Sequence, residues 1–69
     1  MAKEKIVTGY SELQILFTEL GIRFTDSGEA SENLDKDVEI SILEQGGDVA
    51  ATFHFMIDKD GNETYNYTE

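Results

Sequence analysis

The apolar residues of this chain change their spacing once, and that change limits which folds the chain can adopt. Over residues 12–20 they recur at intervals of three and four, which is the spacing of one face of an α-helix. From Val38 onward they alternate with polar residues, which is the period of a strand with one buried face. The sequence therefore predicts an α+β fold in which one N-terminal helix, residues 12–20, packs on an antiparallel sheet.

The predicted helix carries signals at both of its ends. Ser11 and Gln14 form the capping-box pattern at its start. Gly21 follows its last apolar residue, where a glycine in the left-handed conformation ends many helices. Ile22 is placed to make the apolar contact that accompanies such an ending.

Alternation predicts three strands, at residues 38–44, 49–57 and 64–68. The two segments between them, residues 45–48 and 58–62, are rich in Gly, Asp and Asn, as tight turns are. Because short turns join neighbouring antiparallel strands, the sequence predicts a three-stranded meander.

The rest of the chain has a weaker pattern. Residues 26–36 are too polar for a core element and are predicted to form a long acidic loop. A further short edge strand is open at two places, Ile6-Val7 and residues 22–25. In the last strand Tyr65 and Tyr67 are predicted to share a face, because side chains two residues apart point the same way.

Length and composition limit how such a fold is stabilised. The 69 residues make one domain, residues 1–69, in which only about 60% of the unfolded surface is buried. There is no cysteine, so neither a disulfide nor a thiolate ligand is available. Small chains without such staples often gain stability by oligomerising. We therefore expect a homodimer, with the neutral N-terminal third of the chain at its interface.

The charge of the chain is both large and localised. The formal net charge is −10, yet residues 1–25 hold three acids and three bases and sum to zero. Residues 26–69 hold the other 12 acids (15 − 3) and two lysines, which accounts for the whole −10. A magnitude of about 2–8 is enough for the solubility of a small domain. The predicted partner-binding residues are Asp26, Glu29, Glu32, Asp35, Asp37, Glu39, Asp48, Asp58, Asp60 and Glu63.

Residues 58–69 nearly match a calcium-binding loop of the EF-hand type. Positions 1, 3, 5 and 12 of that loop carry the required Asp, Asn or Glu residues. Glu63, however, stands at position 6, where the sharp turn needs glycine, and a strand pattern precedes the segment. An acidic hairpin turn with no metal is therefore predicted, and a calcium-responsive module is the weakest alternative.

The sequence also argues against an enzyme and against a nucleic-acid-binding protein. His54 is the only histidine, and neither a second histidine nor a cysteine accompanies it, so no base-and-nucleophile pair is evident. No catalytic residue and no cofactor are predicted. The chain has five lysines and arginines, too few to neutralise the phosphates of a duplex.

Carboxylates recur at about every third residue from Asp26 to Asp37. Carboxylates three apart stand about 10 Å apart in an extended segment, and alternate ones along a strand about 6.7 Å apart. A domain of this size is about 28 Å across, and duplex DNA of that length carries about 16 charges. Since about half of those charges face any one partner, ten excess charges match the charge density of DNA.

In these features the chain resembles the small acidic DNA-mimic proteins with which phages disable host DNA-binding proteins. It is most similar to the host-takeover inhibitors of phages of Gram-positive bacteria, one of which blocks the nucleoid protein HU. The resemblance lies in size, absence of cysteine, one helix on a small antiparallel sheet, and the carboxylate series from Asp26 to Glu39.

The resemblance implies a non-enzymatic inhibitor that occupies the nucleic-acid-binding surface of a basic host protein, such as a nucleoid-associated protein, in the host cytoplasm. Two other interpretations stay open. In the first, the chain is a small acidic regulatory or adaptor module that binds an unrelated partner at the edge strand that carries its tyrosines. In the second, the charge only keeps a surface loop solvated. Adaptation to high salt is disfavoured, because residues 1–25 are neutral.

Overall fold

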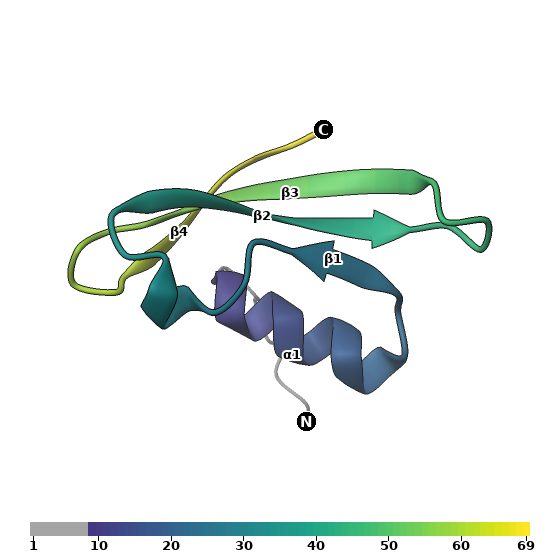
Figure 1. Cartoon of the computed structure of the whole chain (residues 1–69), viewed down its shortest axis with the longest axis horizontal. Coiled ribbons are helices and arrows are strands. Elements are labelled where there is room, and N and C mark those ends of the chain that lie inside the picture. Colours follow the sequence, from purple (N-terminus) through teal and green to yellow (C-terminus); the bar gives the residue numbers. More distant parts are fainter. Residues whose placement is uncertain (1–8) are drawn as a thin grey trace, which may run out of the picture.

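The computed structural model describes residues 9–69. Within them lie one helix, four strands and one 3-10 turn: α1 (Tyr10–Leu20), β1 (Phe24–Asp26), η1 (Ala30–Glu32), β2 (Lys36–Leu43), β3 (Val49–Ile57) and β4 (Glu63–Thr68). The strands form a single antiparallel sheet in the order β1-β2-β3-β4. The helix crosses one face of that sheet (Figure 1). The α+β class predicted from the sequence is confirmed.

The sheet has four strands, so the prediction of three is wrong. The additional strand, β1, pairs with β2 so that Phe24 faces Ile42 and Asp26 faces Ile40. It supplies hydrogen-bonding partners to the edge of β2 with only three residues. A strand of that length is too short to show an alternation pattern in the sequence. Residues 22–25 are one of the two places where the sequence leaves a further edge strand open, and the strand is found there, shifted to Phe24–Asp26. The other choice, Ile6-Val7, lies outside the described residues.

The start of α1 differs from the sequence prediction. Its N-cap is Gly9, which has no side chain to cap the helix, so the prediction that Ser11 and Gln14 form a capping box is wrong. The carboxylate of Glu63, at the start of β4, takes that role. The backbone N–H of Ser11 donates to Glu63 Oε1 at 2.9 Å, and the Ser11 hydroxyl donates to Oε2 at 2.6 Å. A carboxylate there satisfies a free N–H group and lies at the positive end of the helix dipole.

The end of α1 agrees with the prediction. Gly21 has φ +73° and ψ 21°, in the left-handed region that side chains disfavour. The N–H of Ile22 donates to the carbonyl of Phe17 at 2.9 Å, which closes the last turn as expected.

The core lies between α1 and the centre of the sheet. Phe17 packs with its ring centroid 6.0 Å from Phe53 and 5.7 Å from Phe24, edge and tilted arrangements that aromatic rings favour. The buried apolar residues are Tyr10, Leu13, Phe17, Val38, Ile40, Phe55 and Ile57. Because side chains alternate along a strand, the residues between these on β2 and β3 point to the opposite face, which no other layer covers within residues 9–69.

A bulge in β4 separates the two tyrosines that were predicted to share a face. His54 pairs with Tyr67, whereas Phe55 pairs with Tyr65, so the register shifts by one residue at Asn66. Since paired residues of antiparallel strands share a face, Tyr65 lies on the helix side and Tyr67 on the open side. The prediction is therefore wrong, because it assumed unbroken alternation and a bulge adds one residue to the strand.

Candidate functional site: an acidic end of the molecule

Two acidic segments that are distant in sequence meet at one end of the fold. Lys36, the first residue of β2, pairs with Ile57, the last residue of β3. The loop before β2 therefore lies beside the turn after β3. Leu34 approaches Gly61 so closely that a Cβ added to Gly61 would lie 3.9 Å from Leu34 Cδ2. Figure 1 shows η1 and the β3–β4 turn at the same end of the molecule.

We call this region the acidic end. Its six carboxylates belong to Glu29, Glu32, Asp35, Asp37, Asp58 and Asp60. With Lys36 and Lys59 its formal charge is −4 (6 − 2). All six are exposed apart from Asp58, which is half-buried. The ion pair found within residues 9–69 is the one between His54 and Glu69, so no lysine or arginine of that part of the chain neutralises these carboxylates.

Hydrogen bonds hold the acidic loop in a defined conformation. The Tyr10 hydroxyl donates to the carbonyl of Gly28 at 2.7 Å and accepts from the N–H of Ser27 at 3.0 Å. The side-chain amide of Asn33 donates to the carbonyls of Glu29 at 2.8 Å and Ser27 at 3.2 Å. The predicted loop, residues 26–36, is therefore shorter, since its two end residues belong to β1 and β2. Its charges are presented on an ordered backbone.

Tyr10 holds the loop through two hydrogen bonds, and the environment of its side chain shifts the pKa of its hydroxyl. Its side chain is fully buried. Burial raises the pKa of the hydroxyl above its ordinary value of 10.0, and the negative charge of Asp26 adds to that effect. The roles of Tyr10 and Asn33 were not predicted, because a contact between a hydroxyl and a loop 18 residues away leaves no local pattern in the sequence.

The turn between β3 and β4 is organised by the side chain of Asp58. Its Oδ1 accepts from the N–H of Asp60 at 2.9 Å and of Asn62 at 2.8 Å, and its Oδ2 accepts from the Asn62 amide at 3.1 Å. These hydrogen bonds, those from Asn62 first, lower the pKa of Asp58 below its ordinary 3.8. The hairpin turn itself is confirmed, and Glu63 points to the helix cap. No group of ligands in residues 9–69 is arranged to hold a metal ion.

Asp35 adopts a conformation that is rare for a residue with a side chain. Its φ is +60°, in the left-handed region where Asp and Asn are tolerated better than most residues. This bend turns the chain out of the loop and into β2. It also limits which substitutions the acidic end accepts.

The other four predicted partner-binding residues lie elsewhere. Glu39 is on the open face of the sheet, paired with His54. Asp48 is in the β2–β3 turn at the opposite end. Asp26 accepts from Gln14 Nε2 at 2.9 Å. Glu63 caps the helix. The last two are therefore engaged within the fold.

The open face of the sheet holds a small polar group around His54. Its ring stacks on Tyr67 with centroids 4.3 Å apart and planes at 12°. Its Nε2 lies 3.2 Å from Glu69 Oε1, within ion-pair distance, but the alignment is not that of a hydrogen bond. Beside it, the hydroxyls of Ser41 and Thr52 are hydrogen-bonded to each other at 2.9 Å. These contacts agree with the prediction of a sheet-surface histidine.

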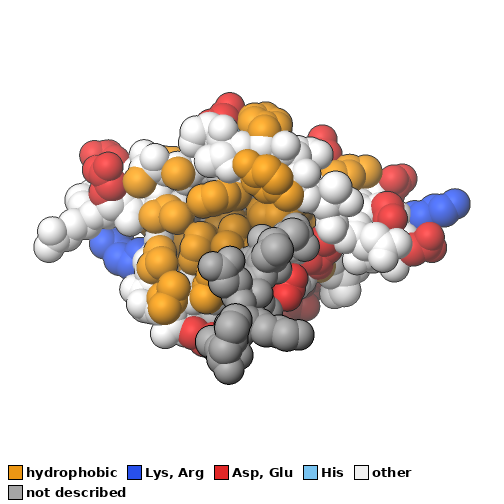
Figure 2. Space-filling model, turned by 180° about the vertical axis from the view of Figure 1, so that it is seen from behind, with side chains coloured by type: hydrophobic (Ala, Val, Ile, Leu, Met, Phe, Trp, Pro, Cys, Tyr) orange, Lys and Arg blue, Asp and Glu red, His pale blue; other side chains and the backbone are white. Residues whose placement is uncertain are grey.

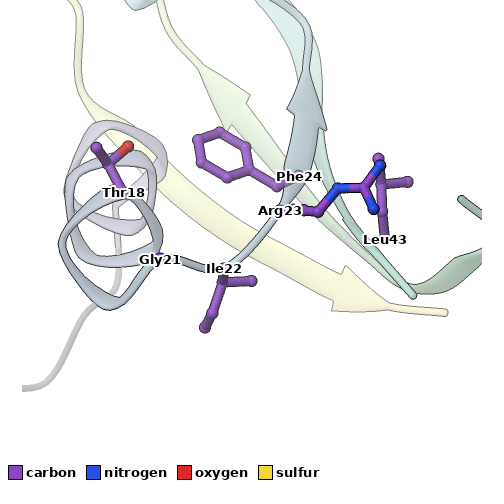
Figure 3. Close-up of a pocket in the computed structure, with 6 residues that line it drawn as sticks. All are labelled: Thr18, Gly21, Ile22, Arg23, Phe24 and Leu43. Atoms are coloured by element: carbon purple, nitrogen blue, oxygen red, sulfur yellow. The ribbon is translucent and has the colours of Figure 1, made fainter. Parts of the chain in front are cut away.

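A shallow groove of about 530 Å³ lies where α1 ends (Figure 3). The Thr18 hydroxyl donates to the carbonyl of Gln14 at 2.8 Å, and Arg23 Nη1 donates to the carbonyl of Gln45 at 3.2 Å. These polar groups are therefore engaged with the backbone. The groove is lined by Thr18, Gly21, Ile22, Arg23, Phe24 and Leu43, a set with no base-and-nucleophile pair.

No family model, no curated protein and no solved structure matches this chain. Its single helix within residues 9–69 is not long and apolar enough to cross a membrane. The acidic end is therefore the candidate site on the strength of its own geometry and charge.

Proposed function

We propose that this protein is a non-enzymatic inhibitor that places its acidic end in the nucleic-acid-binding surface of a basic DNA-binding protein. The observation that carries this proposal is the convergence of the acidic loop and the β3–β4 turn. Convergence concentrates phosphate-like charge in one place, whereas solubility requires only that charge be spread over the surface.

The state of the carboxylates supports the proposal further. Those of Glu29, Glu32 and Asp60 make no ion pair or side-chain hydrogen bond within residues 9–69. A partner's lysines and arginines therefore gain new interactions without displacing existing ones. The ordered loop also reduces the entropy lost when the charges meet a complementary surface.

The dimensions of the molecule are compatible with a short segment of duplex. It extends 36 × 35 × 19 Å. Duplex DNA carries one charge per about 1.7 Å of axis, so about 20 phosphates lie along the longest dimension and about half face one partner. The acidic end, with six carboxylates and a formal charge of −4, supplies part of that half, while the net charge of −10 is spread over other parts of the surface as well. The carboxylates in this proposal replace the phosphates of one side of the duplex.

A competition experiment tests the proposal. The partner is first recovered on the immobilised protein from a lysate and eluted with duplex DNA. The purified partner is then bound to a labelled duplex, and increasing amounts of this protein are added before native gel electrophoresis. We expect free duplex to appear as the partner moves to this protein. A stable ternary complex of duplex, partner and this protein would refute the proposal.

One observation favours a second candidate, an adaptor module with an unrelated partner. β4 is the edge strand of the sheet, and its Tyr65 and Tyr67 are 46% and 52% exposed. An unpaired edge can receive a strand of another protein. In that case Tyr67→Ala weakens binding more than charge reversal at the acidic end does. Duplex DNA then fails to elute the partner.

A further inference from the structure

Within residues 9–69, the helix leaves part of the core uncovered on the side of β3 and β4. Gln14 bonds to Asp26 of β1, and Thr18 lines the groove beside Phe24, so this side of α1 faces β1. At 100° per residue, Leu16 and Leu20 lie on the other side of the helix axis, toward β3 and β4. Leu20 is 63% exposed.

The sheet contributes apolar side chains to the same region. Phe53 touches Phe17 and is only partly buried. The bulge in β4 turns Tyr65 to this side, where its ring lies 5.7 Å from that of Phe55. Ile22, which also lines the groove, points away from Thr18 and Phe24 (Figure 3). We call this surface the apolar flank; it comprises Leu16, Leu20, Ile22, Phe53 and Tyr65.

Charge restricts what the apolar flank can meet. Figure 2 shows apolar side chains gathered into one patch, with most acidic side chains around the margins of that view. Two copies of a protein with net charge −10 repel most strongly where their carboxylates face one another. The five residues of the flank carry no charge. Contact through the flank leaves the acidic end of each copy free, and at physiological salt charges more than about 8 Å apart are largely screened.

The apolar flank is small for a dimer interface. Leu20 and Tyr65 are 63% and 46% exposed, and Leu16, Ile22 and Phe53 are partly exposed. At about 30 Å² per CH₂ group and about 200 Å² per aromatic residue, the flank offers about 200–330 Å² of apolar surface. An interface core is about 65% apolar, so two such surfaces support a contact of about 600–1,000 Å² in total. That is at or below the threshold of about 1,000 Å² for a specific interface, which indicates weak association.

We propose that a second copy of this chain docks on the apolar flank around a two-fold axis and forms a homodimer with micromolar affinity. A two-fold axis is inferred because it buries the same patch on both copies. The dimer then carries two separate acidic ends. The inference does not rest on the proposed function, since it concerns the protein alone.

Sedimentation equilibrium of the full chain at physiological salt, over micromolar to submillimolar concentrations, tests the inference. The test variant is Leu20→Lys, at a side chain that is 63% exposed; the control is Ile15→Lys, on the outer side of the same helix and 60% exposed. Both variants change the net charge from −10 to −9, so repulsion between copies falls equally. Circular dichroism checks that both variants fold as the wild type does.

The wild type should approach twice the 7.7 kDa of one chain as its concentration rises. Leu20→Lys should raise the dissociation constant about 100-fold, about tenfold for each of the two leucines in the dimer, while Ile15→Lys changes it less than about threefold. A mass of 7.7 kDa at every concentration would mean that something other than a second copy covers the flank, and the inference would fail. Equal association by the two variants would also overturn it, because the contact would then lie elsewhere.

Discussion

The contact between Glu63 and the start of α1 is the interaction whose removal should destabilise this fold most clearly. It joins the first turn of the helix to a strand 52 residues away, and it accounts for the contact between α1 and β4 at that end. We predict that Glu63→Ala lowers the free energy of unfolding by about 2 kcal/mol. Glu63→Gln, which keeps the length and one acceptor but loses the charge, should cost about half as much.

The magnitude follows from the geometry of the cap. The carboxylate accepts two hydrogen bonds, at 2.9 and 2.6 Å; a hydrogen bond to a charged group contributes about 1.5–3 kcal/mol, and partial exposure of Glu63 reduces that. A chain of this length has a total stability of about 3–10 kcal/mol. The loss should therefore lower the melting temperature by about 8–16 °C.

Gly9 provides a second perturbation of the same cap. A Cβ at this position would lie 2.8 Å from Glu63 Oε1, so Gly9→Ala must displace the carboxylate from Ser11. The backbone of Gly9, at φ −105° and ψ 153°, is ordinary for alanine. We predict that Gly9→Ala costs about 1 kcal/mol in the wild type and almost nothing in the Glu63→Ala background.

Urea unfolding of the wild type, the two single variants and the double variant, followed by circular dichroism, measures this cycle. Protein concentration is held constant, because dimerisation makes apparent stability depend on it. If the two substitutions add within about 0.3 kcal/mol, the cap does not act as described. A loss below about 0.5 kcal/mol for Glu63→Ala would contradict the account equally.

Three further predictions concern groups at or near the acidic end. The pKa of Tyr10 is raised above 10.0 in the folded protein, so the unfolded chain loses this proton first, and the free energy of unfolding should fall as pH rises above about 10. Tyr10→Phe should remove that fall when stability is measured by urea unfolding. The same dependence of stability on alkaline pH in both proteins would contradict this prediction. The pKa of Asp58 is lowered below 3.8, so its contribution to the free energy of unfolding is present above that pH and lost as pH falls below it. Asp58→Asn should therefore lose less stability than the wild type between pH 5 and 2. An equal loss of stability in both proteins would count against this. Because Asp35 has a positive φ, Asp35→Gly should stabilise the fold by up to about 1 kcal/mol and Asp35→Asn should change it very little, whereas Asp35→Lys should destabilise it. Equal urea midpoints for the three variants would exclude backbone strain at this position.

The regular elements could be predicted because their signals are local. The helix and β3 show spacings of 3.6 and 2 over nine or more residues, and the predicted bounds of β3 are those of the structure. Gly21 ended the helix as predicted, because the left-handed conformation favours glycine. The convergence of the two acidic segments also follows from a meander, because the segment before β2 and the turn after β3 lie at the same end of two paired antiparallel strands.

The features that could not be predicted depend on contacts between distant residues or on a single inserted residue. The helix cap is made by Glu63 instead of by Ser11 and Gln14, and nothing local distinguishes a carboxylate that reaches across the fold. The bulge at Asn66 reverses the side of Tyr65 relative to Tyr67. Four of the ten predicted partner-binding acids lie away from the acidic end, because charge alone does not show which side of the fold a residue reaches.

The central claim is that the acidic end meets the partner, and the association rate of two matched variants tests it most directly. Glu32→Lys with Asp60→Lys reverses one charge in each converging segment. Glu44→Lys with Asp48→Lys reverses two charges at the opposite end of the sheet. Both double variants change the net charge from −10 to −6, so overall attraction to a basic partner falls equally.

Surface plasmon resonance with the partner recovered by elution with duplex DNA gives the rates at several salt concentrations. Electrostatic steering changes association rates by about 10- to 1,000-fold. The account predicts that the acidic-end variant associates about tenfold more slowly than the wild type, with a weaker salt dependence, while the control changes less than about twofold. Equal rates for the two variants, or a slower control, would contradict the claim that the acidic end is the recognition surface.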